Sequence, residues 1–228
     1  MSNITFICEG ASEKNLVEYV LIPYWKNKGF SISGNVIILG EENPGCRGAG
    51  GDVSFERLKI DLSSAMAADK NDSWFTTIFD FYALHGEWPG QQSVKEGLSS
   101  LEKVEKVENA VKGLLASQLE SLPAAERFIP FFMLHEYESL LFVKPSAITE
   151  VTKARKATAD LQKILSGFNS KPEEINTVLS PSQRLARAKA NYGKTLHAHR
   201  IIQIIGIDPV RAVCPHFNDW MTKLERLD

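Results

Sequence analysis

The chain has 228 residues, of which 43% are hydrophobic and 24% are charged, and both values are ordinary for a globular protein. This length suits one large domain, or one domain with an added lobe, and it is long enough for the chain to bury a hydrophobic core. The formal net charge is −2, so the overall charge gives no support for nucleic-acid binding, although residues 184–200 form a basic stretch without an acid.

The sequence gives no sign of membrane insertion or export. No apolar run approaches the roughly 20 residues of a spanning helix, and the N-terminus lacks the pattern of a signal peptide. Cys8, Cys46 and Cys214 are odd in number and lack metal-ligand spacing. We therefore expect free thiols in a reducing compartment, a cytoplasmic location and no membrane partner.

Strand and helix patterns alternate over the first third of the chain. Apolar runs predict strands at residues 4–8, 35–39 and 74–81, with helices at 12–28 and 54–68 between them. Ser12 is the expected cap of the first helix, and Pro23 is expected to shorten or kink that helix. Strands separated by helices in this way predict right-handed βαβ units and a parallel sheet.

Helical patterns dominate the rest of the chain. After a loop at 82–92, a long amphipathic helix is expected over 94–114, and the apolar run at 128–134 predicts a fourth, central strand. Further helices are expected at 148–168, after Lys171, after Ser180, at 199–205 and at 219–227. The fold class is therefore α/β, with a mainly parallel central sheet flanked by helices in residues 1–144 and a helical lobe, residues 145–228, packed on that core.

Carboxylates stand where the predicted strands end. Glu9 follows the first strand, Asp80 ends the third, and Glu136 and Glu138 follow the fourth. The carboxyl ends of neighbouring parallel strands meet at one edge of a sheet, where ligands of open α/β sheets bind. Carboxylates placed that close repel each other unless a cation neutralises them, and hard oxygen ligands favour Mg²⁺ or Mn²⁺. The pattern therefore predicts a divalent-metal site; capping and solvation of the surface are the alternative.

Two other features have several interpretations. The glycine-rich stretch 45–51 resembles a phosphate cradle but lacks the Gly-Lys-Ser/Thr ending of a P-loop. We expect a mobile loop there whose Arg47 contacts a substrate phosphate, and nucleotide binding is the alternative. His135 lies beside the acids, where it could orient a ligand, carry a proton or be a buried structural histidine. The sequence leaves these alternatives open.

The order strand-Glu-Gly-helix, strand-end Asp and later strand-end acid resembles the Toprim domain. More closely, segments along nearly the whole chain resemble a bacterial family catalogued as domain of unknown function 4276. These segments are Cys8-Glu9-Gly10-Ala11-Ser12-Glu13, Gly50-Gly51-Asp52-Val53-Ser54-Phe55-Glu56-Arg57, Phe79-Asp80-Phe81-Tyr82, Trp88-Pro89-Gly90, His135-Glu136-Tyr137-Glu138-Ser139-Leu140-Leu141-Phe142, Lys194-Thr195-Leu196-His197 and Cys214-Pro215-His216-Phe217-Asn218. The resemblance extends to the nuclease domain of overcoming-lysogenization-defect proteins, and it implies a Toprim-like fold that binds Mg²⁺, often paired with an ATPase in phage defence.

The resemblance implies a phosphodiesterase whose metal ligands are Glu9, Asp80, Glu138 and Glu136. Lys194 is expected to stabilise negative charge on the phosphate. Tyr82 departs from the Toprim pattern, because it stands where the second acid of Asp-x-Asp is usual. The expected function is thus a Mg²⁺- or Mn²⁺-dependent nuclease acting on DNA or RNA, with an ATPase partner and a possible homo-oligomeric state. The alternative is a non-catalytic Toprim-fold subunit that regulates a partner or binds nucleic acid.

Overall fold

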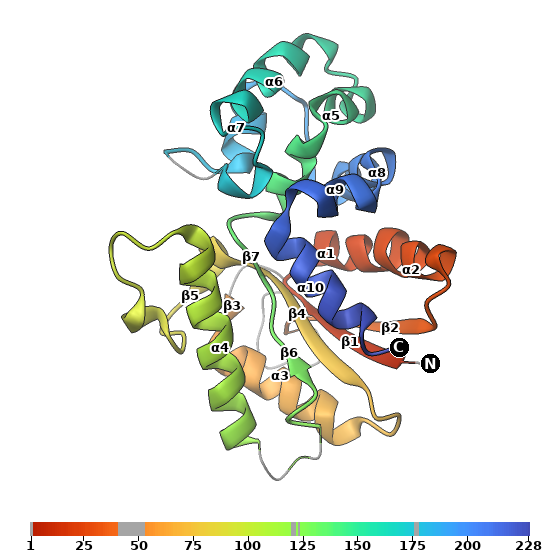
Figure 1. Ribbon diagram of the computed structural model, residues 1–228, viewed down its shortest axis with the longest axis vertical. Coiled ribbons are helices and arrows are strands. Elements are labelled where there is room, and N and C mark those ends of the chain that lie inside the picture. Colours follow the sequence, from red (N-terminus) through yellow and green to blue (C-terminus); the bar gives the residue numbers. More distant parts are fainter. Residues whose placement is uncertain (1, 41–52, 120–121, 123, 176–177) are drawn as a thin grey trace.

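A computed structural model describes residues 2–40, 53–119, 122, 124–175 and 178–228 (Figure 1). The strands are β1 Ser2–Cys8, β2 Ile32–Ile38, β3 Val53–Ser54, β4 Trp74–Asp80, β5 Leu84–His85, β6 Phe128–Ile129 and β7 Phe132–Met133. The α-helices are α1 Ala11–Leu16, α2 Ile22–Lys28, α3 Phe55–Ala68, α4 Ser100–Gln118, α5 Pro145–Thr152, α6 Thr158–Gly167, α7 Pro181–Arg187, α8 Lys194–Ile205, α9 Ile207–Val213 and α10 Pro215–Glu225. Shorter helical segments are the π-helical η1 Val17–Leu21 and the 3₁₀ segments η2 Phe81–Ala83, η3 Gln91–Ser93, η4 Tyr137–Val143, η5 Arg155–Ala157 and η6 Pro172–Glu174.

The central sheet has the order β2-β1-β4-β6, and β7 also pairs with β4. All of these pairings are parallel, which confirms the predicted α/β class with a mainly parallel sheet flanked by helices. Cys8 is in register with Ile38 on one side and with Ile78 on the other. The three longest strands therefore end at nearly the same edge. β3 and β5 form a separate pair.

The strand predicted over 128–134 is divided into β6 and β7 at Pro130, which has no N–H for the ladder. Side chains of β4 supply bonds across the break. Thr76 Oγ1 donates to Ile129 O at 2.6 Å, and Thr77 Oγ1 accepts from Phe131 N at 2.9 Å. The chain thus stays beside β4 and continues to the same edge.

The first predicted helix, 12–28, consists of α1, the π-helical turn η1 and α2. The prediction that Ser12 caps this helix was wrong: Gly10 is the capping residue, and Ser12 is buried inside α1. Pro23 cannot donate to Tyr19 O, the carbonyl four residues earlier, and the Gln203 side chain donates to that oxygen at 2.9 Å. The irregular turn is therefore fixed from outside by α8.

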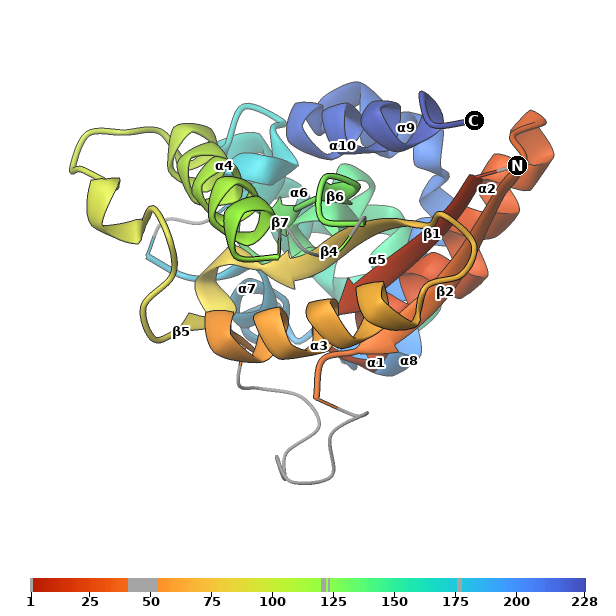
Figure 2. The same cartoon turned by 90° about the horizontal axis from the view of Figure 1, so that it is seen from below.

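The sheet lies between two helical layers, because successive residues of a strand face opposite sides. Phe6 of β1 and Ile78 of β4 belong to the hydrophobic cluster that includes α1, α2 and α10. Ile7 and Phe79 belong to the other cluster, with α3 and α4. Figure 2 shows α3 and α10 on opposite sides of the sheet.

The long helix α4 begins at Ser100, six residues later than predicted. Gly97 has φ +90°, a left-handed conformation that ends any helical pattern before it. Ser99 and Glu102 then form a capping box, in which each side chain bonds the backbone N–H of the other. The local capping chemistry thus overrides the apolar periodicity that begins at Val94.

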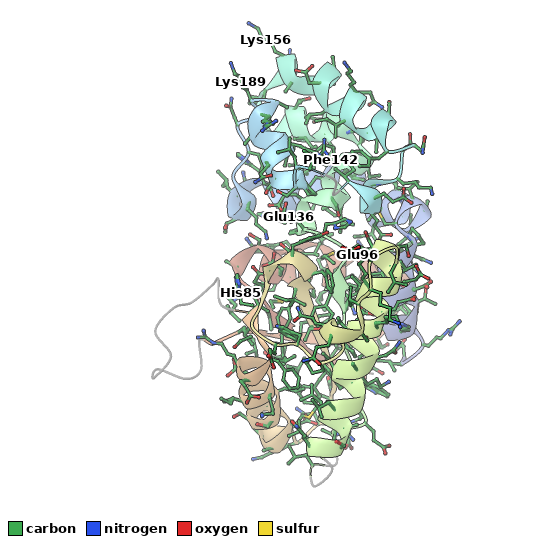
Figure 3. The ribbon with its side chains drawn as sticks, turned by 90° about the vertical axis from the view of Figure 1, so that its left-hand side faces the viewer. His85, Glu96, Glu136, Phe142, Lys156 and Lys189 are labelled. Carbon is green, nitrogen blue, oxygen red and sulfur yellow. The ribbon has the colours of Figure 1, made fainter. Side chains whose placement is uncertain are left out.

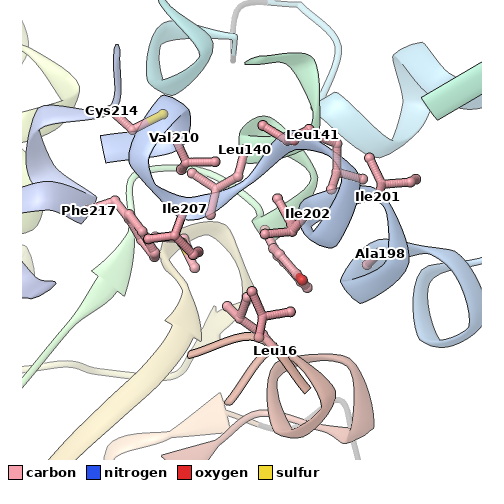
Figure 4. Packing of buried hydrophobic residues seen from close by; sticks show 14 of the residues in the cluster. Leu16, Leu140, Leu141, Ala198, Ile201, Ile202, Ile207, Val210, Cys214 and Phe217 are labelled. Atoms are coloured by element: carbon pink, nitrogen blue, oxygen red, sulfur yellow. The ribbon is translucent and has the colours of Figure 1, made fainter. Parts of the chain in front are cut away.

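The C-terminal helices serve two purposes. Helices α5 to α7 form one end of the molecule, whereas α10 returns to the sheet (Figure 1). There the Trp220 ring stacks on Phe131, with 4.3 Å between the ring centroids. Between them, η4, α8 and α9 pack apolar side chains against Leu16 of α1 (Figure 4). Ser180 caps α7 as predicted, whereas α9 was not predicted. None of the described helices is both long and apolar enough to cross a membrane.

Candidate functional site

Glu9, the residue after β1, and Asp80, the last residue of the adjacent strand β4, lie side by side at the carboxyl edge of the sheet. Glu9 N donates to Ile78 O at 3.2 Å, and Glu9 Oε2 accepts from Asp80 N at 3.2 Å. The strand pattern therefore predicted correctly that these two acids share one edge. Asp80 is only 5% exposed.

Glu138 joins them from the 3₁₀ segment η4, which follows β7. Its side chain is buried, and Glu138 Oε1 accepts from the Tyr192 hydroxyl at 3.2 Å. The neighbouring Tyr137 N donates to Asp80 Oδ1 at 2.8 Å. This backbone bond ties the start of η4 to the end of β4, so both acids face one space.

A fourth carboxylate, Glu13, comes from the first turn of α1 and was not predicted as a site residue. It is buried, and Glu13 Oε1 lies 3.1 Å from Lys194 Nζ. Its position four residues after Glu9, on the helix face that also buries Leu16 and Val17, is the signal that would have found it. We call Glu9, Glu13, Asp80 and Glu138 the acidic cluster.

Lys194, the first residue of α8, places its ammonium group among these acids. Its Nζ lies 3.0 Å from Asp80 Oδ2 and 3.9 Å from Glu138 Oε2. Helix α8 is held there partly by α1, since Asn15 Nδ2 donates to Thr195 O at 3.2 Å. Figure 1 shows α8 near α1. The predicted association of Lys194 with the acids is therefore present in the structure.

Burial shifts the ionisation of the cluster. Desolvation raises the pKa of Glu9, Asp80 and Glu138, although the nearby charge of Lys194 opposes that shift in each case. Desolvation alone would lower the pKa of Lys194, but the surrounding carboxylates outweigh it and raise the pKa above its usual value. Lys194 thus stays charged and, among the described residues, is the one lysine or arginine in contact with the acidic cluster.

Glu136 is not part of the cluster. Its carboxylate accepts from Ser182 N at 2.8 Å and from Ser182 Oγ at 3.1 Å, at the N-terminus of α7. Glu136 lies in extended backbone, whereas Glu138 belongs to η4, so the two side chains separate. Glu136 therefore holds α7 against the strand end instead of reaching the other acids.

The aromatic residues around the cluster differ in exposure. Tyr82, which stands in place of a second Asp, is 65% exposed and stacks on the His135 ring at 5.2 Å. Desolvation, with a smaller effect of Lys103, lowers the pKa of His135 to about 4, so His135 is neutral near pH 7. The Tyr137 hydroxyl is fully buried and has no hydrogen-bond partner among the described residues. The sequence did not predict Tyr137 as a site residue.

Other candidates lie elsewhere. His216 is buried against Glu108, with 3.1 Å between Nε2 and Oε1, and packs on Phe131 in the core. His216 therefore contributes to packing of α10 against the sheet. Arg47 and the glycine-rich stretch 45–51 lie outside the described residues.

The donor chemistry of the cluster fits a hard divalent cation, because all four side chains offer carboxylate oxygens. The orphaned Tyr137 hydroxyl also suits a further polar occupant nearby. However, within the described part of the chain no three Asp, Glu, His or Cys side chains form a group arranged to hold a metal ion. A metal would therefore require Lys194 to move and the carboxylates to turn.

Comparison with known proteins gives one match. The family model described as "Domain of unknown function (DUF4276)" matches residues 8–225. No curated protein and no solved structure matches the chain.

Proposed function

Since the chain belongs to the family called domain of unknown function 4276, whose name assigns no activity, we propose from its own site that it is a Mg²⁺- or Mn²⁺-dependent phosphodiesterase of Toprim type that cleaves nucleic acid. The observation that carries this proposal is the acidic cluster, in which four carboxylates, from the end of β1, from α1, from β4 and from η4, meet with the ammonium group of Lys194. Buried carboxylates in such excess need protons or another cation.

Glu9, Asp80 and Glu138 would hold the metal, with Glu13 as a further donor. The cation would activate a water molecule and neutralise charge on a phosphodiester. Lys194, whose side chain is 33% exposed, can turn its ammonium from Asp80 to a phosphate oxygen. Tyr192 holds Glu138 in place through its hydroxyl. We further propose an anti-phage role with an ATPase partner in the cytoplasm; the support is the resemblance to Toprim nucleases.

A second candidate is a non-catalytic subunit that regulates a partner or binds nucleic acid. Two observations favour it: Lys194 already neutralises part of the acidic cluster, and the exposed Tyr82 supplies no second strand-end carboxylate. In that case the ion pairs of Lys194 are a permanent structural element. The two candidates differ in whether purified protein cleaves a phosphodiester.

The test is cleavage of plasmid, single-stranded DNA and tRNA with Mg²⁺, with Mn²⁺ and with EDTA. Glu9→Gln keeps the shape of the side chain and its acceptor for Asp80 N but removes a charge that the metal needs, so we expect cleavage to be lost. Glu150→Gln, at an exposed position on α5, is the matched control and should cleave normally. Metal-independent cleavage, or equal rates for Glu9→Gln and the wild type, would refute the proposal. Complete inactivity of the wild type on every substrate favours the second candidate.

A further inference from the structure

The charge of the chain is divided unevenly along its length. Residues 144–200, which include α5 to α7 and most of α8, carry eleven Lys and Arg against four Asp and Glu, a formal net charge of +7. The remaining residues carry −9, which gives the total of −2. The low overall charge therefore conceals a strongly basic region next to an acidic one.

Two adjoining hollows lie on the basic helical end of the molecule. One, of about 450 Å³, is formed by α6 and α7 and their flanking residues, and the other, of about 570 Å³, lies beside η5 and the residues after α7. Asp160 and Ala188 line both, so the two hollows share a wall. We call them the basic hollows.

Basic side chains line both hollows, and few acids oppose them. The first hollow contains Lys163, Arg184 and Arg187, with Asp160 as its acid. The second is lined by Lys153, Arg155, Lys156, Lys189 and the same Asp160. Within the described residues, none of these lysines, nor Arg155 or Arg187, has a carboxylate oxygen within 4.0 Å. A concave surface with this much uncompensated positive charge attracts a polyanion.

The backbone holds two of these lysines in an unfavourable conformation. Lys153 has φ +60° and Lys189 has φ +53°, and Asn191 at the same rim has φ +49°. Left-handed backbone is unusual for residues other than glycine, but it is common where a helix ends, and Lys153 is the C-cap of α5. Figure 3 shows Lys156 and Lys189 at the same end of the molecule.

The second hollow adjoins the acidic cluster through a short segment of chain. Asn191 lines the hollow, the Tyr192 hydroxyl bonds Glu138, and Lys194 Nζ contacts Asp80. The Cα atoms of residues 191 and 194 are at most about 10 Å apart, and the side chains of Tyr192 and Lys194 extend from there to Glu138 and Asp80. A strand with phosphates in the hollow would therefore reach the cluster within a few nucleotides.

We propose that the basic hollows bind the phosphate backbone of a nucleic-acid strand and deliver it to the acidic cluster. This inference rests on the proposed function, because it assigns that function's substrate to a surface. Recognition is by backbone charge, since the described lining residues include one aromatic ring, Phe168, which the Arg184 guanidinium covers at 4.9 Å. We therefore expect little dependence on base sequence.

The test measures binding of fluorescein-labelled single-stranded DNA, and of RNA of the same mixed sequence, by anisotropy in EDTA over a range of salt concentrations. Lys156→Glu/Lys163→Glu reverses one exposed lysine in each hollow. Lys106→Glu/Lys112→Glu reverses two exposed lysines on α4 and changes the total charge equally. Melting temperatures of both variants verify folding.

We expect the hollow variant to bind at least tenfold more weakly. Its slope of log affinity against log salt should fall by roughly 1.4, because each single-strand phosphate contact contributes about 0.7. The α4 variant should stay within about twofold of wild type. Wild-type affinity in the hollow variant, an equal loss in the α4 variant or no binding by wild type would each overturn the inference. Because EDTA prevents metal-dependent cleavage, inactivity of the enzyme would refute the nuclease proposal without deciding this one.

Discussion

Replacement of Lys194 by Met removes the ammonium group from the acidic cluster and keeps the apolar stem. At about 3 Å and an effective dielectric of about 20, one ion pair has a gross Coulomb energy of about 5 kcal/mol. Desolvation offsets much of this, and removing one partner of a buried pair costs about 3–5 kcal/mol net. Because the Lys194 side chain is 33% exposed, we expect the lower end, about 3 kcal/mol.

The loss of stability caused by Lys194→Met should depend on pH. The folded-state pKa values of Glu9, Asp80 and Glu138 are raised above those of the unfolded chain. Groups shifted in this direction favour the folded state below their unfolded pKa and lose that contribution as pH rises through the folded pKa. Without Lys194 these pKa values rise further. The variant should therefore resemble wild type most closely near pH 5 and differ most near pH 8.

Thermal melting of both proteins in EDTA across this pH range checks the prediction. For a chain of this size, about 3 kcal/mol corresponds to a melting-temperature loss of roughly 6–12 °C. Lys194→Met/Glu13→Gln should recover part of the loss, since it removes one of the unpaired carboxylates. An unchanged melting temperature at pH 8, or a penalty independent of pH, would refute the view that Lys194 neutralises the cluster.

Three further outcomes are expected. Adding Mn²⁺ should raise the melting temperature of Lys194→Met more than that of wild type, because no ammonium group competes for the carboxylates; equal increases would argue against a shared position. Glu136→Gln should lower stability by about 1 kcal/mol, because it weakens the cap of α7, and should still cleave. Glu138→Gln should lose cleavage. The reverse pattern of cleavage rates would contradict the site assignment. Desolvation alone would lower the pKa of His216, but Glu108 outweighs it and the pKa is raised. The His216–Glu108 pair should therefore stabilise the protein at pH 6 and less so at alkaline pH. The difference in melting temperature between wild type and His216→Gln should shrink as pH rises.

The sequence predicted the positions of the site residues best where those residues lie at strand ends. Short apolar runs followed by an acid placed Glu9 and Asp80 on adjacent strands, because parallel pairing brings such ends together. The association of Lys194 with the acids came from family resemblance, since nothing local indicates that α8 packs on α1.

The remaining site residues depend on packing that local patterns do not encode. Glu13 could have been found from its place on the buried face of α1, whereas Tyr137 is buried in the 3₁₀ segment η4, which the sequence did not predict. Glu136 was placed with the metal ligands from its position after a strand. It instead bonds α7, which begins more than forty residues later. Long-range contacts of this kind are set by the whole fold.

Hydrogen bonds link residues of β1 and α2, and the residue before β2, to residues 225–228 in the folded protein. The Ser2 hydroxyl donates to Leu227 O, Ser31 N donates to Asp228 Oδ2, and Trp25 Nε1 donates to Glu225 Oε1. Strand β1 lies inside the sheet, yet it is synthesised well before α10, which covers one face of that sheet.

This arrangement constrains synthesis of the protein on the ribosome. Until α10 emerges, the nascent chain lacks Trp220, so no indole ring packs against Phe6 and Phe131. The acidic cluster likewise waits for residue 194 before it gains an internal cation. Neutralisation of the site therefore requires synthesis up to residue 194, and completion of the apolar core requires synthesis up to α10, so a chain that stops before residue 194 has neither a closed core nor a neutralised site.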